Sequence, residues 1–218
     1  MKLYDVMVVD DQPLFIDGIK ALNQRINGFN IISDACNGKD LIKKLNKQLP
    51  EVVLLDIEMP VMDGMETTRY LHEFFPQLKI IILTGHNEQG VARKCLADGA
   101  HGYLQKHSNI ETIAEAVRDV MNKGYYLNST LKKHLDEIKE NSTILNEEIV
   151  LQLKASILTE REMEILKLVM EELSNQEIAD KLVLSVKTID AHKANIVKKT
   201  NSKTIIGAVI YAVNQGWI

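Results

Sequence analysis

The sequence predicts an α/β domain with a doubly wound, five-stranded parallel sheet, followed by a small all-α domain. Two patterns lead to this prediction. Over the first 125 residues, short apolar runs rich in Val and Ile alternate with helical periods, as strands covered on both faces of a parallel sheet require. From Thr159 onward, four helical periods follow one another with no strand between them, so the second domain is expected to contain helices only.

The first domain is predicted to contain five β/α units. The expected strands are Leu3–Val9, Asn30–Ser33, Val52–Leu55, Lys79–Leu83 and Gly102–Gln105. The expected helices are Pro13–Ile26, Lys39–Gln48, Gly64–Phe75, Glu88–Asp98 and Ile110–Asn122. In an open sheet of this kind, ligands bind outside the carboxyl ends of the strands.

The helices of the second domain begin with clear capping signals. They are expected at Glu160–Met170, Asn175–Lys181, Val186–Lys199 and Thr204–Asn214. Thr159, followed three residues later by Glu162, forms a capping box at the first of them. A short helix, a brief turn and a longer basic helix then form a helix-turn-helix pattern.

The boundaries follow from a change in composition. Residues 126–153 are polar and lack a core-sized apolar face, so we interpret them as a linker. The expected domains are therefore 1–125 and 154–218.

Bulk properties favour a cytoplasmic protein. Of the 218 residues, 45% are hydrophobic and 26% are charged, as in globular proteins. The two cysteines, Cys36 and Cys95, lack metal-ligand or redox spacing. No apolar run approaches the roughly 18 residues that span a bilayer, and the first residues contain no evident export signal. We therefore expect no membrane partner.

The charge is unevenly distributed. The net charge is −4, yet the stretch from Lys181 to Lys203 contains six lysines and one acid, Asp190. A local basic stretch on an acidic protein indicates one anionic partner. Taken alone, the same stretch is also consistent with a solvated helix face.

Polar side chains that can perform chemistry follow four of the expected strands. Asp10 and Asp11 follow the first, Asp56 the third, Thr84 the fourth and Lys106 the fifth. Three carboxylates with no His or Cys favour a hard cation, in practice Mg²⁺. A carboxylate can attack phosphorus to form an aspartyl-phosphate, while Mg²⁺ and a lysine neutralise the transferring group.

These residues resemble the receiver domain of two-component response regulators over about residues 3–123. The matching segments are Val8-Val9-Asp10-Asp11, Leu54-Leu55-Asp56-Ile57-Glu58-Met59-Pro60, Leu83-Thr84-Gly85 and Gly102-Tyr103-Leu104-Gln105-Lys106. The resemblance implies a flavodoxin-like receiver fold. His107 stands where this family usually has proline after the lysine, so the cis bond that is common in the family is not assumed here.

The resemblance also implies a role for each matching residue. Asp56 would accept phosphate from a sensor histidine kinase. Asp11 would bind Mg²⁺ directly, with Asp10 acting through water and Glu58 through its backbone carbonyl. Thr84 and Tyr103 would form a switch pair. Lys106 would contact the phosphate.

The basic helix has a face suited to DNA. At about 100° per residue with Ile189 inward, the outward stripe consists of Lys187, Ala191, Ala194 and Lys198. Small residues between lysines suit a helix in the major groove, with the lysines near phosphates. Periodicity alone fits an exposed helix in any small bundle equally well.

The second domain is similar to the LuxR-type helix-turn-helix. The matching segments are Leu158-Thr159-Glu160-Arg161-Glu162, Leu173-Ser174-Asn175-Gln176-Glu177-Ile178-Ala179 and Leu184-Ser185-Val186-Lys187-Thr188-Ile189. The whole chain resembles a NarL/FixJ-type response regulator. This resemblance places Asp190, Ala191 and Ala194 nearest the bases, and Lys187, Thr188, Lys193 and Lys198 near the DNA backbone.

The resemblance further implies a homodimer through the last helix. The apolar stripe on that helix, Ile205, Ala208, Val209 and Ala212, fits a core or a dimer interface equally well.

The sequence thus predicts a regulator in which phosphorylation of Asp56 controls sequence-specific binding to double-stranded DNA and transcription. We expect no enzymatic turnover beyond Mg²⁺-dependent self-phosphorylation from small phosphodonors and autodephosphorylation. The alternatives are a DNA-binding regulator controlled independently of phosphorylation, a protein-interaction adaptor, and an aspartyl-phosphate phosphatase. The last of these usually has Asp-x-Asp-x-Thr, whereas this chain has Asp56-Ile57-Glu58-Met59-Pro60.

Overall fold

The computed structural model describes residues 2–85, 89–128 and 157–218. The chain divides into two compact units, Met1–Tyr126 and Leu127–Ile218. Tyr126 lies one residue beyond the domain end expected from the sequence, because its side chain is buried and its N–H donates to the carbonyl of His101 at 2.8 Å. Residues 129–153 of the expected linker lie outside the described residues.

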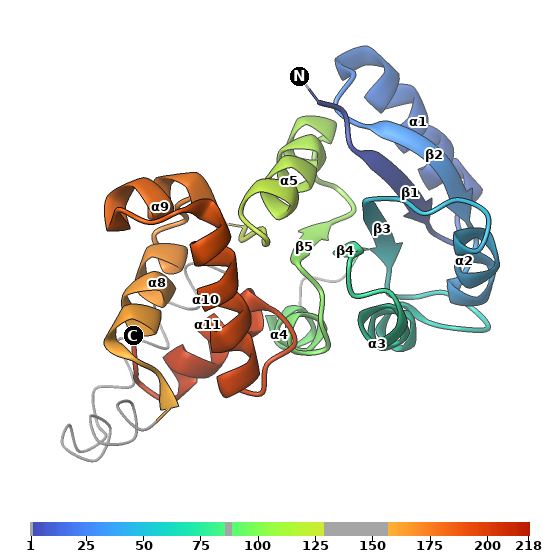
Figure 1. Ribbon diagram of the computed structural model, residues 1–218. Coiled ribbons are helices and arrows are strands. Elements are labelled where there is room, and N and C mark those ends of the chain that lie inside the picture. The colour runs from blue at the N-terminus through green and yellow to red at the C-terminus, as the bar shows by residue number, and fades with distance from the viewer. Residues whose placement is uncertain (1, 86–88, 129–156) are drawn as a thin grey trace. The chain divides into compact units, whose positions relative to one another are not determined.

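The first unit contains the expected five-stranded parallel sheet, in the order β2-β1-β3-β4-β5 (Figure 1). Its strands are β1 (Asp5–Val9), β2 (Asn30–Ala35), β3 (Val52–Asp56), β4 (Lys79–Thr84) and β5 (Gly102–Gln105). Its helices are α1 (Pro13–Ile26), α2 (Gly38–Leu45), α3 (Gly64–Phe74), α4 (Gln89–Ala97) and α5 (Ile110–Asn122). The chain reverses its direction of winding between β1 and β3, which creates a crevice at their carboxyl ends.

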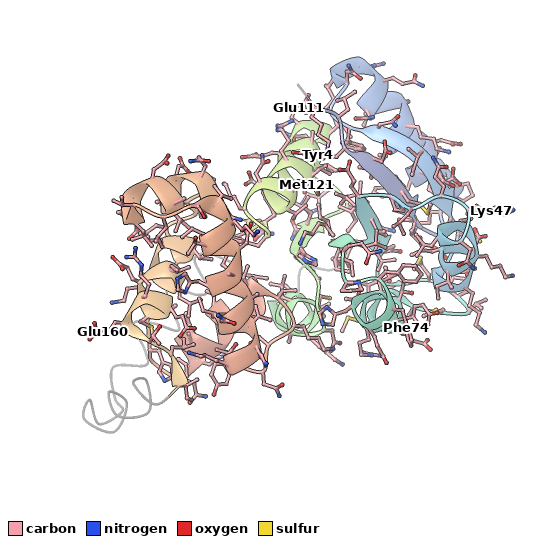
Figure 2. The ribbon with its side chains drawn as sticks, viewed as in Figure 1. Tyr4, Lys47, Phe74, Glu111, Met121 and Glu160 are labelled. Carbon is pink, nitrogen blue, oxygen red and sulfur yellow. The ribbon has the colours of Figure 1, made fainter. Side chains whose placement is uncertain are left out.

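Continuous burial of the central strands explains their composition. Every residue of β3 is buried, as are the last five residues of β4. Helices α1 and α5 contact each other and cover one face of the sheet, while α2 contacts α3. The apolar core beneath α1 and α5 includes Ile16, Ile19, Leu54, Leu83, Ile113 and Val117. Tyr4 and Met121, labelled in Figure 2, pack against the edge of this core.

The described part of the second unit contains α8 (Glu160–Met170), α9 (Asn175–Leu182), α10 (Val186–Lys199) and α11 (Ile205–Asn214). Thr159 and Ser174 each form a complete capping box, with Glu162 and Glu177 respectively. The turn between α9 and α10 places Val183 at a left-handed φ of 56°. This turn and its two helices give the predicted helix-turn-helix.

The core formed by residues 157–218 uses the inward faces of these four helices. Its buried side chains include Ile165, Val169, Ile178, Ile189, Ile196 and Val209. The apolar stripe of α11 is buried as well, and α11 contacts α8 and α10. The Glu162 carboxylate also accepts from Nζ of Lys199 at 2.7 Å, which fastens the start of α8 to the end of α10.

No helix in the described ranges is long and apolar enough to cross a membrane.

Acidification is expected to destabilise the first unit through His101. This imidazole is 8% exposed, and its Nδ1 accepts the N–H of Ile80 at 3.3 Å. Burial, with Lys79 and His72 nearby, lowers the pKa of His101 well below its ordinary value of 6.5. The unfolded chain therefore binds a proton below pH 6.5 that the folded chain does not bind. The free energy of unfolding falls as the pH drops below that value.

Between pH 6.5 and 5.5, protonation of this one group in the unfolded chain lowers the free energy of unfolding by at most about 1 kcal/mol. Urea unfolding at each pH, followed by NMR signals of β4 and β5, measures this pH dependence of the free energy of unfolding. The same measurement on His101→Gln gives the pH dependence without the imidazole. An equal pH slope for wild type and variant would contradict the assignment.

Candidate functional site

The residues that were predicted to form the site lie at the carboxyl edge of the sheet. Register pairs Val9 with Leu55 and Asp56 with Leu83, so β1, β3 and β4 end side by side. The N–H of Asp10 donates to the carbonyl of Ala35 at 3.0 Å. The N–H of Lys106 donates to the carbonyl of Thr84 at 2.8 Å. These backbone bonds bring residues that are distant in sequence to one place.

Three carboxylates meet there. Asp10 and Asp56 are 1% and 3% exposed, whereas Asp11 is exposed to solvent. One oxygen from each of the three lies within 4.8 Å of the others. Oδ1 of Asp10 accepts the N–H of Gln12 at 2.9 Å, and Oδ1 of Asp56 accepts the N–H of Ile57 at 2.8 Å. Each buried carboxylate is therefore held by one oxygen, which fixes the direction of the other.

Lys106 links the two buried acids. Its Nζ lies 2.7 Å from Oδ2 of Asp10 and 2.9 Å from Oδ2 of Asp56. Both contacts are ion pairs, so the Lys106 ammonium compensates the two buried carboxylates. The two buried carboxylates and the exposed Asp11 form the all-oxygen donor set that a hard divalent cation prefers.

The pKa values reflect this crowding. Burial raises the pKa of the Asp56 carboxyl above its ordinary value, against the lowering effect of Lys106. Burial works to lower the pKa of Lys106, but the carboxylates of Asp10 and Asp56 outweigh it and raise that pKa. Lys106 is therefore a cation at neutral pH, and bringing further positive charge to Asp56 is favourable.

The segment after β3 packs against the backbone of Asp56. The N–H of Gly64 donates to the carbonyl of Ile57 at 2.9 Å. A Cβ at Gly64 would lie 2.1 Å from the Asp56 carbonyl oxygen, so no other residue fits there without displacing the backbone. Asp63 caps α3 by accepting the N–H of Glu66 at 2.7 Å. The start of α3 is thereby packed directly against the backbone of Asp56.

The remaining predicted residues surround this centre. Thr84 is fully buried at the end of β4, and Tyr103 on β5 is 4% exposed. A Cβ at Gly85 would meet no described atom within 4 Å, which leaves space beside Thr84. Glu58 and His107 are exposed. The described backbone contains no cis peptide bond, so the Lys106–His107 linkage, which the sequence left open, is trans.

An apolar cleft opens beside Lys106. It has a volume of about 330 Å³ and lies between α1 and the β5–α5 segment, with Leu14, Phe15, Leu22 and Ile110 in its wall. Nζ of Lys106 lies 5.0 Å from the centre of the Phe15 ring. Leu14 is 86% exposed at this position, so a large apolar side chain faces solvent next to the carboxylate site.

In the second unit, α10 presents the predicted stripe. Lys187, Ala191, Ala194 and Lys198 are all exposed, and Ile189 and Ile196 are buried on the opposite side. Asp190 is also exposed, and Thr188 is partly exposed in the first turn. Ser185 caps the helix by accepting the N–H of Thr188 at 3.1 Å.

Lys193 has a different environment from the other lysines. It is 7% exposed, and its Nζ donates to Oδ1 of Asn175 on α9. Lys193 follows Ile189 by four residues, so the helical repeat places it only about 40° from the inward direction. The prediction that Lys193 lies near the DNA backbone did not take this direction into account. Asn175, which the sequence did not single out as a functional residue, also donates from Nδ2 to Oδ1 of Asp190 at 2.7 Å.

The fold and the site define a class: a receiver domain with a clustered acidic site, followed by a helix-turn-helix domain. Comparison with known proteins agrees in both parts. Residues 6–118 match the family described as the response regulator receiver domain. Residues 156–212 match the bacterial regulatory proteins of the luxR family. The chain belongs to the response regulators with a receiver domain and a LuxR-type DNA-binding domain.

Similar proteins match this chain over nearly their full length. The transcriptional regulatory protein DegU of Brevibacillus brevis is 31% identical over 98% of this chain and 94% of its own. LnrK of Bacillus subtilis, also a transcriptional regulatory protein, is 33% identical over 97% of both chains. A crystal form of the RcsB response regulator of Salmonella typhimurium matches 97% of this chain and 98% of its own, with 26% identity and a TM-score of 0.56.

Proposed function

We propose that Asp56 accepts a phosphoryl group from a sensor histidine kinase, and that this phosphorylation controls DNA binding by residues 154–218. The observation that carries the proposal is the buried pair of Asp10 and Asp56, linked by Lys106 at the carboxyl edge of the sheet. In the transfer, an oxygen of Asp56 attacks phosphorus while the bond from phosphorus to the kinase histidine breaks. The bonding electrons return to the imidazole.

The residues of the site divide the work. Asp10, Asp11 and Asp56, with the backbone carbonyl of Glu58, would hold Mg²⁺, which when bound neutralises charge on the phosphoryl oxygens. Lys106, whose Nζ lies 2.9 Å from Oδ2 of Asp56, supplies a second positive charge. The space beside Thr84 admits the phosphoryl group, and Thr84 and Tyr103 form the switch pair that senses it. The same site supports self-phosphorylation from small phosphodonors and autodephosphorylation.

The proposed partners are the kinase, double-stranded DNA and a second copy of the chain. The exposed Leu14 and the cleft beside Lys106 favour docking of the kinase next to Asp56. The exposed lysine–alanine stripe of α10 favours the major groove, with Lys187 and Lys198 near phosphates. Since the α11 stripe is buried, a homodimer on phosphorylation would use other surfaces. The proposed location is the cytoplasm, where the kinase and DNA are accessible.

The test combines two measurements on the wild-type protein. After incubation with acetyl phosphate and Mg²⁺, intact-protein mass spectrometry is expected to show one phosphoryl adduct. The treated protein should then retain a specific subset of genomic DNA fragments more tightly than the untreated protein does. Equal retention by the two forms, despite a full adduct, would support control independent of phosphorylation.

Mg²⁺ is expected to stabilise the receiver domain through Asp11. A ligand that binds only the folded state adds about 2.7 kcal/mol to the free energy of unfolding at roughly one hundred times its dissociation constant. Asp11→Asn should remove most of this gain, because it deletes the exposed carboxylate of the cluster. Asp17→Asn, an exposed acid on α1 outside the cluster, is the matched control and should keep the gain. Thermal unfolding with and without Mg²⁺ measures the effect; equal gains in both variants would argue against this site.

A further inference from the structure

Asp190 lies beside the exposed lysine–alanine stripe of α10, and its negative charge is not explained by binding of that stripe to DNA phosphates. Asp190 is exposed, and it is the one acid in the six-lysine stretch from Lys181 to Lys203. A carboxylate close to DNA is repelled by the phosphates and by every acceptor atom on the base edges. Its presence there costs affinity unless it meets a hydrogen-bond donor.

Asp190 is held in place from the neighbouring helix. Nδ2 of Asn175, in the first turn of α9, donates to Oδ1 of Asp190 at 2.7 Å. Oδ1 of the same Asn175 amide accepts from Nζ of the buried Lys193. An ammonium can only donate and a carboxylate can only accept, so the amide has one satisfactory orientation. The network fixes the Asp190 side chain before DNA arrives.

A fixed carboxylate can discriminate between bases. With Oδ1 engaged by Asn175, Asp190 can make a favourable base contact only by accepting a hydrogen bond. In the major groove, guanine offers the acceptors N7 and O6, and thymine offers O4. Cytosine offers its N4 amino group, and carboxylates characteristically accept from this group.

We infer that Asp190 selects a base with an exocyclic amino group, cytosine before adenine, at one position of each DNA half-site, and that Asn175 is the positioning residue that makes this selection. The inference rests on the proposed function, since it requires α10 to lie in the major groove. Lys193 contributes through Asn175 and not by contact with the phosphates.

The test is selection of binding sites from random-sequence double-stranded DNA with the full-length, acetyl phosphate-treated protein, followed by affinity measurements on single-base variants of the selected site. Wild type is expected to prefer cytosine at one position per half-site by roughly five- to 150-fold. Asp190→Ala should reduce this preference to near unity while leaving the preferences at other positions. Asp190→Asn, which keeps an acceptor and adds a donor, should shift it towards adenine, whose N6 amino group and N7 match an amide.

Variants of Asn175 test whether this residue orients Asp190 or only stabilises the fold. Asn175→Ala should weaken the preference at the same position, and it should change no preference further in the Asp190→Ala background. Gln176→Ala, a neighbouring exposed change whose side chain bonds within α9 to Asp180, should keep the wild-type preferences. Thermal unfolding verifies that each variant is folded.

The outcomes distinguish this inference from the proposed function. A wild type that enriches no sequence would overturn both. A wild type that enriches a motif whose every preference survives in Asp190→Ala would overturn the inference alone. If Asn175→Ala loses affinity without a change of base preference, Asn175 has a structural role only. That result would overturn its assignment as the positioning residue.

Discussion

Replacing Asp56 with Asn is expected to abolish the phosphoryl adduct and the acetyl phosphate-dependent gain in DNA binding. The amide removes the nucleophilic carboxylate but retains an oxygen that can accept the N–H of Ile57, now 2.8 Å from Oδ1. It also removes one of two buried like charges. The receiver should therefore remain folded while losing its chemistry. Intact-protein mass and DNA retention, each with and without acetyl phosphate, measure the two losses.

The matched control for this variant is Asp17→Asn, which makes the same carboxylate-to-amide replacement at an exposed acid of α1. It should acquire one adduct and respond to acetyl phosphate as wild type does. An adduct of wild-type yield on Asp56→Asn would show that another residue accepts the phosphoryl group. Full stimulation of DNA binding in that variant would sink phosphorylation of Asp56 as the control.

Removing the ammonium between the two buried acids should have the largest effect on stability. Lys106→Met leaves Asp10 and Asp56 without the cation that lies 2.7 and 2.9 Å from their oxygens. Removing one partner from a buried ion pair costs about 3–5 kcal/mol, because the remaining charge is uncompensated. In the absence of Mg²⁺, the free energy of unfolding should fall by about that amount. Urea unfolding followed by NMR signals of β1 and β3 isolates the receiver transition.

A second substitution tests the electrostatic cause. Adding Asp10→Asn to Lys106→Met removes the repulsion between the two acids, so it should restore part of the lost stability. Lys43→Met, which removes an exposed lysine from α2, should change the free energy of unfolding by less than about 0.5 kcal/mol. If the double variant is less stable than Lys106→Met, packing of the lysine stem and not its charge explains the loss.

Several features were determined by local sequence signals. The apolar runs located all five strands because a parallel strand is buried on both faces, and Pro13–Ile26, Ile110–Asn122 and Val186–Lys199 were predicted with the bounds that the structure shows. Asp10, Asp11, Asp56 and Lys106 could be placed together because parallel strands end at a common edge. Thr159 and Glu162 defined the start of α8 through bonds between residues three apart.

Other features depend on contacts between elements. Periodicity left the α11 stripe equally suited to core or dimer, and its packing on α8 and α10 placed it in the core. The close approach of Gly64 to the Asp56 carbonyl depends on how α3 meets the end of β3. Neither could be read from one segment, because each depends on the distance to a second one.

Helix α10 shows most clearly which features the sequence determined and which depended on tertiary contacts. The sequence by itself determined its length, its cap at Ser185 and its exposed stripe, because these follow from residues within one helix. Only the tertiary structure decided that Lys193 is buried and that Asn175 joins it to Asp190. Those bonds cross from α9 to α10 over 15 and 18 residues of chain. A helical repeat gives the direction of a side chain, but the group that it meets depends on the packing of a second helix.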